Sequence, residues 1–118
     1  MNLMTIIQLV DSNYPNAFPI EAKVRWLNEC EGLVQTEVML LAPEEVLEYT
    51  WNENQDTEML ALKPHHKIYW VYLLAMIDLA NNEYDKYTNT IAVFNTYFDE
   101  YMRWYAERNP LADRRVEE

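Results

Sequence analysis

The feature that most constrains this chain is an aromatic stripe in its C-terminal third. Apolar and aromatic residues follow one another there at alternating spacings of three and four: Tyr84, Tyr87, Ile91, Phe94, Phe98, Tyr101 and Tyr105. That spacing is the period of one buried helix face, so it predicts a long helix, which we name the aromatic spine. Tyr97 and Trp104 lie one heptad apart beside the stripe and widen the apolar face. We expect the spine to organise the core.

The scarcity of glycine favours helices over strands. The chain has 118 residues, of which half are hydrophobic and one is a glycine. Few positions can therefore need a positive φ, which disfavours both a hairpin-rich β protein and a glycine-rich phosphate loop. A chain of this length forms one domain with a modest core. We predict a single, mainly α domain over residues 1–118 that ends in a flexible tail at about 109–118.

Apolar periodicity and turn-forming residues divide the chain into four helices. The expected helices span residues 4–12, 19–40 and 64–81, followed by the spine. Asn81 or Asn82 is the best residue in the connection for a left-handed helix end, because asparagine tolerates that conformation better than other non-glycine residues. The last two helices are joined so closely that they should run antiparallel. The predicted architecture is a small four-helix antiparallel bundle.

The segment between the second and third helices, residues 44–63, is the least regular. Residues 46–51 and 58–62 alternate only in part, so we expect an ordered long loop or a short two-stranded β-ribbon. The segment is rich in carboxylates, which suggests a calcium site. It lacks the regular ligand spacing and the tight-turn glycine of a calcium loop, so a solvated or partner-facing loop is the favoured interpretation.

Four residues are candidates for a chemically active site: Glu31, His65, His66 and Cys30. Glu31 completes the apolar stripe of the second helix. A catalytic acid is one interpretation; the favoured one is that Glu31 lies at the edge of the stripe or accepts a structural hydrogen bond, for instance from a tyrosine of the spine. His65 and His66 would point about 100° apart on a helix and cannot form one chelating face. Cys30 lies on a buried helix face with no base beside it in sequence. We therefore expect no enzymatic activity, cofactor or metal.

The charge and the cysteine count limit the partners and the compartment. A net charge of −11 disfavours gripping nucleic acid, which requires clustered Lys and Arg. One cysteine excludes an intramolecular disulfide, and the apolar start lacks the length and basic flank of a secretory signal. The apolar run 68–77 is bounded by Lys67 and Asp78 and falls short of the roughly 18 to 20 residues that cross a bilayer. These features predict a soluble intracellular protein with no membrane contact.

Several spaced blocks of residues carry a family resemblance. They are Tyr69, Tyr72, Leu73, Ala75, Ile77 and Asp78; Asn82, Glu83, Tyr84, Asp85, Tyr87 and Asn89; Phe94, Asn95, Tyr97, Tyr101, Trp104 and Tyr105; and upstream TyrProAsnAlaPhe at 14–18 and TrpLeuAsnGluCysGluGly at 26–32. In this order they resemble small head-tail connector proteins of tailed phages and prophages of Gram-positive bacteria, over about residues 3–108. The chain departs from the family pattern at Asn82, where a glycine is common, and at Pro19, where a serine or aspartate cap is common.

The resemblance implies a mainly helical adaptor that forms a ring beneath the portal protein. Such a ring bridges the portal to a further connector or tail-completion protein, and DNA passes through it without sequence-specific binding. The implied location is the head-tail interface of the virion, and the bacterial cytoplasm during assembly. An acidic channel lining would repel phosphates, although plain solubility explains the same charge equally well. The alternative function is an acidic, non-enzymatic binding or regulatory module.

The candidate partner interface lies in the stretches that the helical core does not claim. These are the loop 44–63 and the C-terminal segment 108–118, in which Pro110 stops the spine. The residues that we expect to contact a portal or a neighbouring subunit are Glu44, Glu45, Glu48, Trp51, Glu53, Asp56, Arg108, Leu111, Arg114 and Arg115. Both stretches are expected to become ordered on assembly.

Overall fold

The computed structural model describes residues 1–109 as a mainly helical domain. Its helices are α1 (Leu3–Asn13), α2 (Ile20–Leu33), α3 (Trp51–Asn54), α4 (Lys67–Ala80) and α5 (Tyr84–Arg108). A π-helical turn, η1 (Val34–Val38), continues α2, and a 3-10 turn, η2 (Pro43–Glu45), follows it. Residues 110–118 lie outside the described residues, and with them Leu111, Arg114 and Arg115 of the predicted interface.

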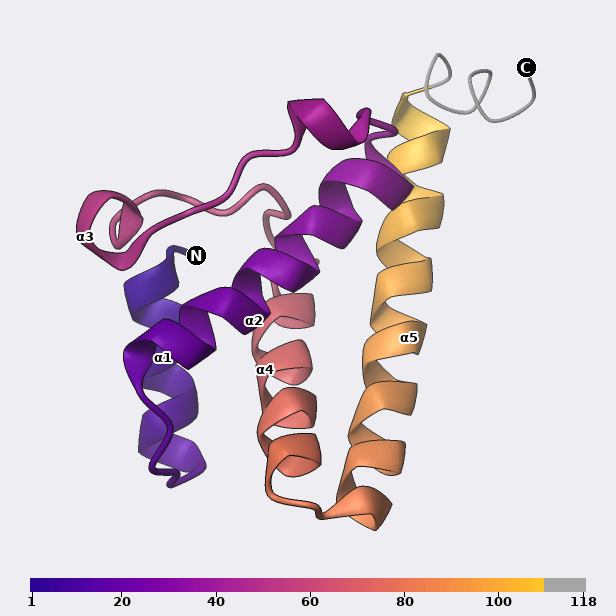
Figure 1. The fold of residues 1–118 in the computed structure, drawn as a ribbon. Coiled ribbons are helices and arrows are strands. Elements are labelled where there is room, and N and C mark those ends of the chain that lie inside the picture. Colours follow the sequence, from indigo (N-terminus) through magenta and orange to yellow (C-terminus); the bar gives the residue numbers. More distant parts are fainter. Residues whose placement is uncertain (110–118) are drawn as a thin grey trace.

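An antiparallel hairpin of α4 and α5 forms one side of the domain (Figure 1). Phe94 of α5 meets Tyr72 of α4 edge to face, with ring centres 5.0 Å apart, and stacks on Phe98 at 5.4 Å. Asn82, in the short connection, has a φ of 59° and so adopts the left-handed conformation predicted for Asn81 or Asn82. The aromatic contacts confirm the spine as a helix that packs on its predecessor.

The spine is buried only in its middle and C-terminal part. Phe94, Phe98 and Tyr101 are buried, whereas Tyr84 at the start of α5 is 60% exposed. Tyr84 therefore belongs to the periodic stripe but not to the core. The reason is positional, because Tyr84 lies beside the connection, where α4 has already ended at Ala80.

The expected four-helix antiparallel bundle is not confirmed. Figure 1 shows α2 crossing in front of α4 obliquely, while α4 and α5 run side by side. α1 packs against both α2 and α4 through Leu3, Ile6, Ile7 and Val10, which are buried. The described residues thus form a compact helical domain in which α4 lies at the centre. None of the helices in residues 1–109 combines the length and the apolar character needed to span a membrane.

The predicted β-ribbon is wrong. Segments 46–51 and 58–62 do not pair with each other, and Trp51 begins α3 rather than ending a strand. Among residues 1–109, the β-type pairing is one antiparallel bridge between Asn2 and Glu58. The loop is nevertheless ordered and extended on both sides of α3. Its backbone is paired with side chains of α2 instead of with a second strand, as described below.

Candidate functional site

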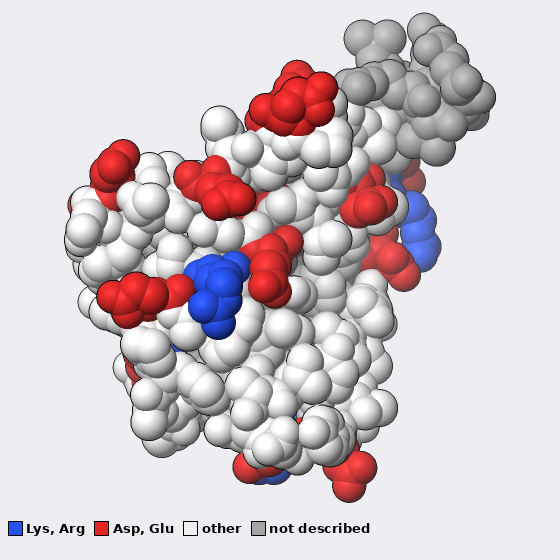
Figure 2. All heavy atoms as spheres, in the orientation of Figure 1, with Lys and Arg blue, Asp and Glu red and all other residues white. Residues whose placement is uncertain are grey.

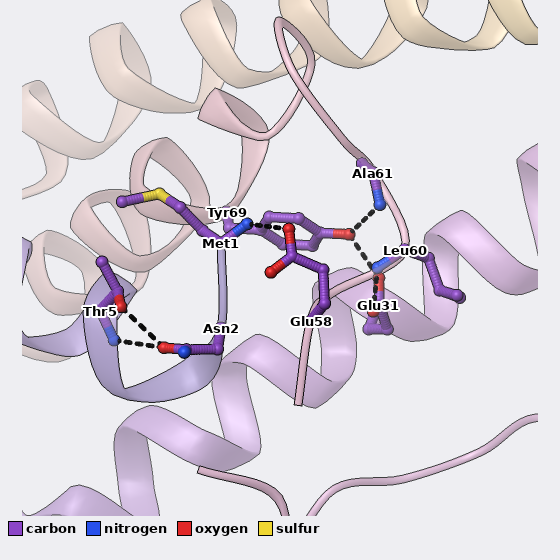
Figure 3. Close-up of polar contacts among 8 residues, drawn as sticks. All are labelled: Met1, Asn2, Thr5, Glu31, Glu58, Leu60, Ala61 and Tyr69. Atoms are coloured by element: carbon purple, nitrogen blue, oxygen red, sulfur yellow. Dashed lines mark hydrogen bonds and ion pairs between the residues drawn. The ribbon is translucent and has the colours of Figure 1, made fainter. Parts of the chain in front are cut away.

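Glu31 is the most deeply buried charged residue of the described chain, with an exposed fraction of 0%. Its Oε1 accepts a hydrogen bond of 2.6 Å from the Tyr69 hydroxyl, and its Oε2 accepts bonds of 2.9 Å from the Leu60 backbone N–H and the Tyr49 hydroxyl. Figure 3 shows the first two contacts converging from α4 and from the loop. The prediction that Glu31 is a structural acceptor is confirmed. The donors, however, are tyrosines of α4 and the loop rather than of the spine.

The surroundings of Glu31 suit a carboxylate that holds the fold together. Burial raises the pKa of Glu31, and the hydrogen bonds from Tyr69, Leu60 and Tyr49 offset part of that rise. Burial and the charge of Glu31 in turn raise the pKa of both tyrosines, so they remain donors at neutral pH. The Tyr69 hydroxyl also accepts a bond of 2.7 Å from the Ala61 N–H. Glu31 therefore connects α2, α4 and the loop.

Two side-chain amides on α2 and η1 extend this polar row and hold the loop backbone. Asn28 donates from Nδ2 to the Tyr49 carbonyl at 2.9 Å and accepts at Oδ1 from the Tyr49 N–H at 2.8 Å. Gln35 makes the same pair of bonds to Leu47, at 3.0 and 2.9 Å. Each amide thus pairs with one loop residue as a neighbouring strand would. This explains why residues 46–49 are extended without belonging to a sheet.

Sequence reasoning considered Glu31 but missed Asn28 and Gln35. The signal was present, because Asn28, Glu31 and Gln35 recur at spacings of three and four along one face of the helix. Polar side chains at such positions, next to buried apolar residues, predict that an irregular segment lies against the helix and uses them as hydrogen-bond partners.

A groove of about 470 Å³ lies between the first half of α2 and residues 48–51. Its lining residues are Glu21, Val24, Arg25, Asn28, Glu29, Glu48, Tyr49, Thr50 and Trp51. Figure 2 shows this face of the molecule, with a basic group flanked by acidic groups over α2. Glu48 and Trp51 of the predicted interface are brought together here. The groove offers exposed carboxylates above an apolar and aromatic floor.

The other predicted interface residues do not form one surface with this groove. Glu44 and Glu45 are exposed on η2, which lies at the same end of the molecule as the C-terminal end of α5 in Figure 1. Glu53 and Asp56 are exposed in and after α3, on the side of the N-terminus, where the Met4 N–H donates to the Gln55 carbonyl at 3.1 Å. Apart from Glu48 in the groove, the loop thus presents carboxylates at two separate places.

Arg108, the one basic residue of the predicted interface that lies within residues 1–109, is the last residue of α5. Arg108 is exposed, and its guanidinium lies 4.7 Å from the centre of the Trp104 ring. Trp104 is itself 37% exposed, so the pair forms a small aromatic and cationic surface.

A second buried carboxylate, Asp78 of α4, was not singled out from the sequence as a site. It is 3% exposed and accepts hydrogen bonds from the Tyr14 hydroxyl and, at 3.4 Å, from Thr90 Oγ1. The bond to Asp78 raises the pKa of Tyr14. Together with Lys86, these residues line a hollow of about 250 Å³. Asp78 therefore joins the loop after α1 to both helices of the hairpin.

The histidines and the cysteine lie in aromatic or apolar surroundings. His65 and His66 are in the turn before α4 rather than on the expected helix, and their rings approach Trp104 at 4.9 Å and Trp70 at 5.2 Å. Burial lowers the pKa of both imidazoles and raises the pKa of the Cys30 thiol. Within residues 1–109, no cluster of three or more His, Cys, Asp or Glu side chains is arranged to hold a metal.

No protein-family model matches the chain, and neither a curated protein nor a solved structure does. Its role is therefore inferred from its residues and their arrangement.

Proposed function

We propose that this protein is a structural, non-enzymatic head-tail connector. It oligomerises as a ring beneath a phage portal and bridges the portal to the next connector or tail-completion protein. The observation that carries this proposal is that sequence blocks resembling the connector family contact one another directly. The Tyr14 hydroxyl of the first block donates to Asp78 of α4, and the Tyr72 hydroxyl of α4 donates to Glu29 of the α2 block at 3.1 Å. The resemblance therefore falls on one contiguous packing unit rather than on scattered positions.

The state of the buried carboxylates supports a structural role. Glu31 and Asp78 are the buried acidic side chains of the described residues, and both accept hydrogen bonds from hydroxyl groups that belong to the fold. A general acid or base must reach a substrate proton. The groove beside α2 is lined by Asn28 and Tyr49, which flank Glu31, but not by Glu31 itself.

The distribution of charge supports an adaptor around DNA. Acidic groups stand apart from one another on the face drawn in Figure 2 and lie on several elements. A net charge of −11 repels phosphates, so a ring of such subunits lets DNA pass without binding its sequence. The exposed loop carboxylates lie on η2, in the groove and around α3, and give an adaptor more than one surface for partners. The corresponding location is the head-tail interface of a virion, after assembly in the host cytoplasm.

Electron microscopy of portal rings tests this proposal. Portal protein encoded by the same genome is imaged alone, with this protein in excess, and with an unrelated acidic protein of similar size. We expect added ring density at the tail-facing end of the portal only with this protein. Unchanged portal images at saturating concentration would contradict the connector role. A phage from which the gene is deleted should accumulate DNA-filled heads without tails.

The groove beside α2 favours a second candidate function, an acidic module that regulates a basic partner. Its lining holds Glu21, Glu29 and Glu48 against Arg25. Such a module should bind a basic protein with steep salt dependence and add no density to portal rings. Portal imaging and the salt dependence of binding to a basic protein therefore separate the two functions.

A further inference from the structure

The groove between α2 and residues 48–51 has the chemistry of an arginine site. Glu21, Glu29 and Glu48 are exposed carboxylates of its lining, and Tyr49 and Trp51 supply half-buried aromatic rings. A guanidinium pairs with carboxylates through its planar fork and also stacks on aromatic faces. An ammonium group pairs with carboxylates as a point charge and has no planar face to stack. The combination of acids and aromatic rings in one groove therefore fits arginine better than lysine.

The groove is held open by contacts within the fold. Asn28 fixes the backbone of Tyr49 through two hydrogen bonds of 2.8 and 2.9 Å. The Tyr72 hydroxyl of α4 donates to Glu29 at 3.1 Å and so positions this carboxylate. A ligand that enters the groove finds its walls already ordered, which lowers the entropic cost of binding.

The chain itself contains a matching segment beyond the described residues. Arg114 and Arg115 are the only two lysine or arginine residues that are adjacent in the sequence, and Val116 follows them. The described chain ends at the C-terminal end of α5, whereas the groove lies on the opposite side of the molecule, between α2 and the segment leading into α3 (Figure 1). The C-terminal end of α5 and the groove are therefore two different surfaces of one copy.

We propose that Arg114 and Arg115 of one copy occupy the acidic groove of a second copy. The contact joins two different surfaces, so it is heterologous, and its repetition closes a ring when the rotation between copies allows. Arg25, the cation of the groove lining, is available to the tail carboxylates Glu117 and Glu118. This inference rests on the proposed function, because it supplies the subunit contact of the connector ring.

Charge reversal on each side of the contact tests the inference in the full-length protein. Arg114→Glu/Arg115→Glu reverses the tail, and Glu21→Arg/Glu48→Arg reverses the groove. Self-association is measured by sedimentation over a range of protein concentrations, in about 50 and about 500 mM salt, because screening weakens ion pairs at the higher salt. We expect wild-type association at low salt, a loss of about tenfold or more in either variant, and recovery when the two variants are mixed.

Glu37→Arg/Asp99→Arg is the matched control. It changes the net charge as much as the groove variant does, at two exposed residues outside the groove, and should associate at least as well as the wild type. Three results would overturn the inference: a wild-type protein that is monomeric at every concentration, equal loss in the control, or no recovery in the mixture.

Imaging with portal rings separates this inference from the proposed function. If the groove variant still adds ring density to the portal, the groove contact is wrong and the connector role stands. If the wild type adds no density but shows the expected charge-dependent association, the connector role is wrong and the groove contact stands.

Discussion

The Tyr69 hydroxyl of α4 donates a 2.6 Å hydrogen bond to the carboxylate of Glu31 on α2, and both side chains have an exposed fraction of 0%. The same hydroxyl accepts a hydrogen bond from the Ala61 N–H. The row of hydrogen bonds from Ala61 through Tyr69 to Glu31 thus joins the loop, α4 and α2. A buried polar network of this kind stabilises the fold only while every member keeps its partner. The extended loop is therefore coupled to the helical core at this point.

Replacement of Glu31 by glutamine should destabilise the protein. The carboxylate accepts three hydrogen bonds and donates none, so a glutamine NH2 group would face hydrogen-bond donors. We expect Glu31→Gln to lower the free energy of unfolding by about 1–3 kcal/mol in urea titrations. Tyr69→Phe, which leaves the Ala61 N–H unpaired, should cost about the same, and the two losses should not add because the residues share one network.

Glu29→Gln is the control for that experiment. Glu29 is exposed and accepts one hydrogen bond, from Tyr72. Its change to glutamine should cost no more than about 0.5 kcal/mol, as for most surface substitutions. Similar losses for Glu29→Gln and Glu31→Gln would show that the three donors to Glu31 are not important for stability.

Hydrogen exchange of the backbone N–H groups should reveal which side-chain amide, that of Asn28 or that of Gln35, holds which loop residue. Asn28→Ala removes the acceptor of the Tyr49 N–H, and Gln35→Ala removes the acceptor of the Leu47 N–H. We expect each variant to lose protection chiefly at its own partner, with a stability cost of about 1–3 kcal/mol for the buried Gln35. Asn52→Ala, an exposed position on α3, should change neither amide. Equal loss at Tyr49 and Leu47 in both variants would mean that the segment opens as a unit.

The helices could be predicted from the sequence because each carries its own apolar period. The expected helix at residues 4–12 and the spine agree closely with α1 and α5. The expected helix at 64–81 begins three residues early, since residues 63–66 form a turn that presents His65 to Tyr101 and Trp104. Such a start depends on contacts with α5, which local periodicity does not contain.

The loop could not be predicted in the same way, because its partners are distant side chains. The partial alternation of apolar and polar residues at 46–51 correctly predicted an extended backbone. The β-strand propensity of 46–51 and 58–62 wrongly predicted that these two segments pair with each other. In the structure Asn28 and Gln35 take the place of that strand. Likewise, the groove combines Glu48 and Trp51 with residues of α2 that lie 19 to 30 positions earlier in the sequence, so only the fold brings them together.

Alanine substitutions along α5 should separate buried from exposed members of the spine. Phe94 and Phe98 are 4% and 8% exposed, so Phe94→Ala or Phe98→Ala should cost about 3–5 kcal/mol through lost contacts and an unfilled cavity. Tyr84→Ala is the control, because Tyr84 belongs to the same stripe but is 60% exposed, and it should cost less than about 1 kcal/mol. Thermal or urea unfolding measures all three. Near-neutral effects at both phenylalanines would mean that α5 does not pack on α4 as described.

Lowering the pH through the range in which histidine titrates, near its ordinary pKa of about 6.5, should lower the free energy of unfolding. Burial lowers the pKa of His65 and His66 below the ordinary value of about 6.5, so the unfolded chain binds protons first as the pH falls. The contribution of these groups to stability is complete above about pH 6.5 and is lost as the pH falls toward the lowered folded pKa. Lys67 and Arg108 act in the same direction on His65, whereas Glu100 opposes them.

Urea titrations between about pH 7.5 and 5 measure this loss, and His65→Phe/His66→Phe identifies its source. Phenylalanine retains a ring against Trp104 and Trp70 but removes both the titration and the buried Nδ1 atoms, which have no hydrogen-bond partner among the described residues. Since these are the only histidines of the chain, the variant should lose most of the pH dependence above about pH 6. An unchanged slope in the variant would assign the acid sensitivity to carboxylates instead. Glu31 could not supply that slope, because its raised pKa makes the folded state bind the proton first, so its contribution increases rather than decreases as the pH falls.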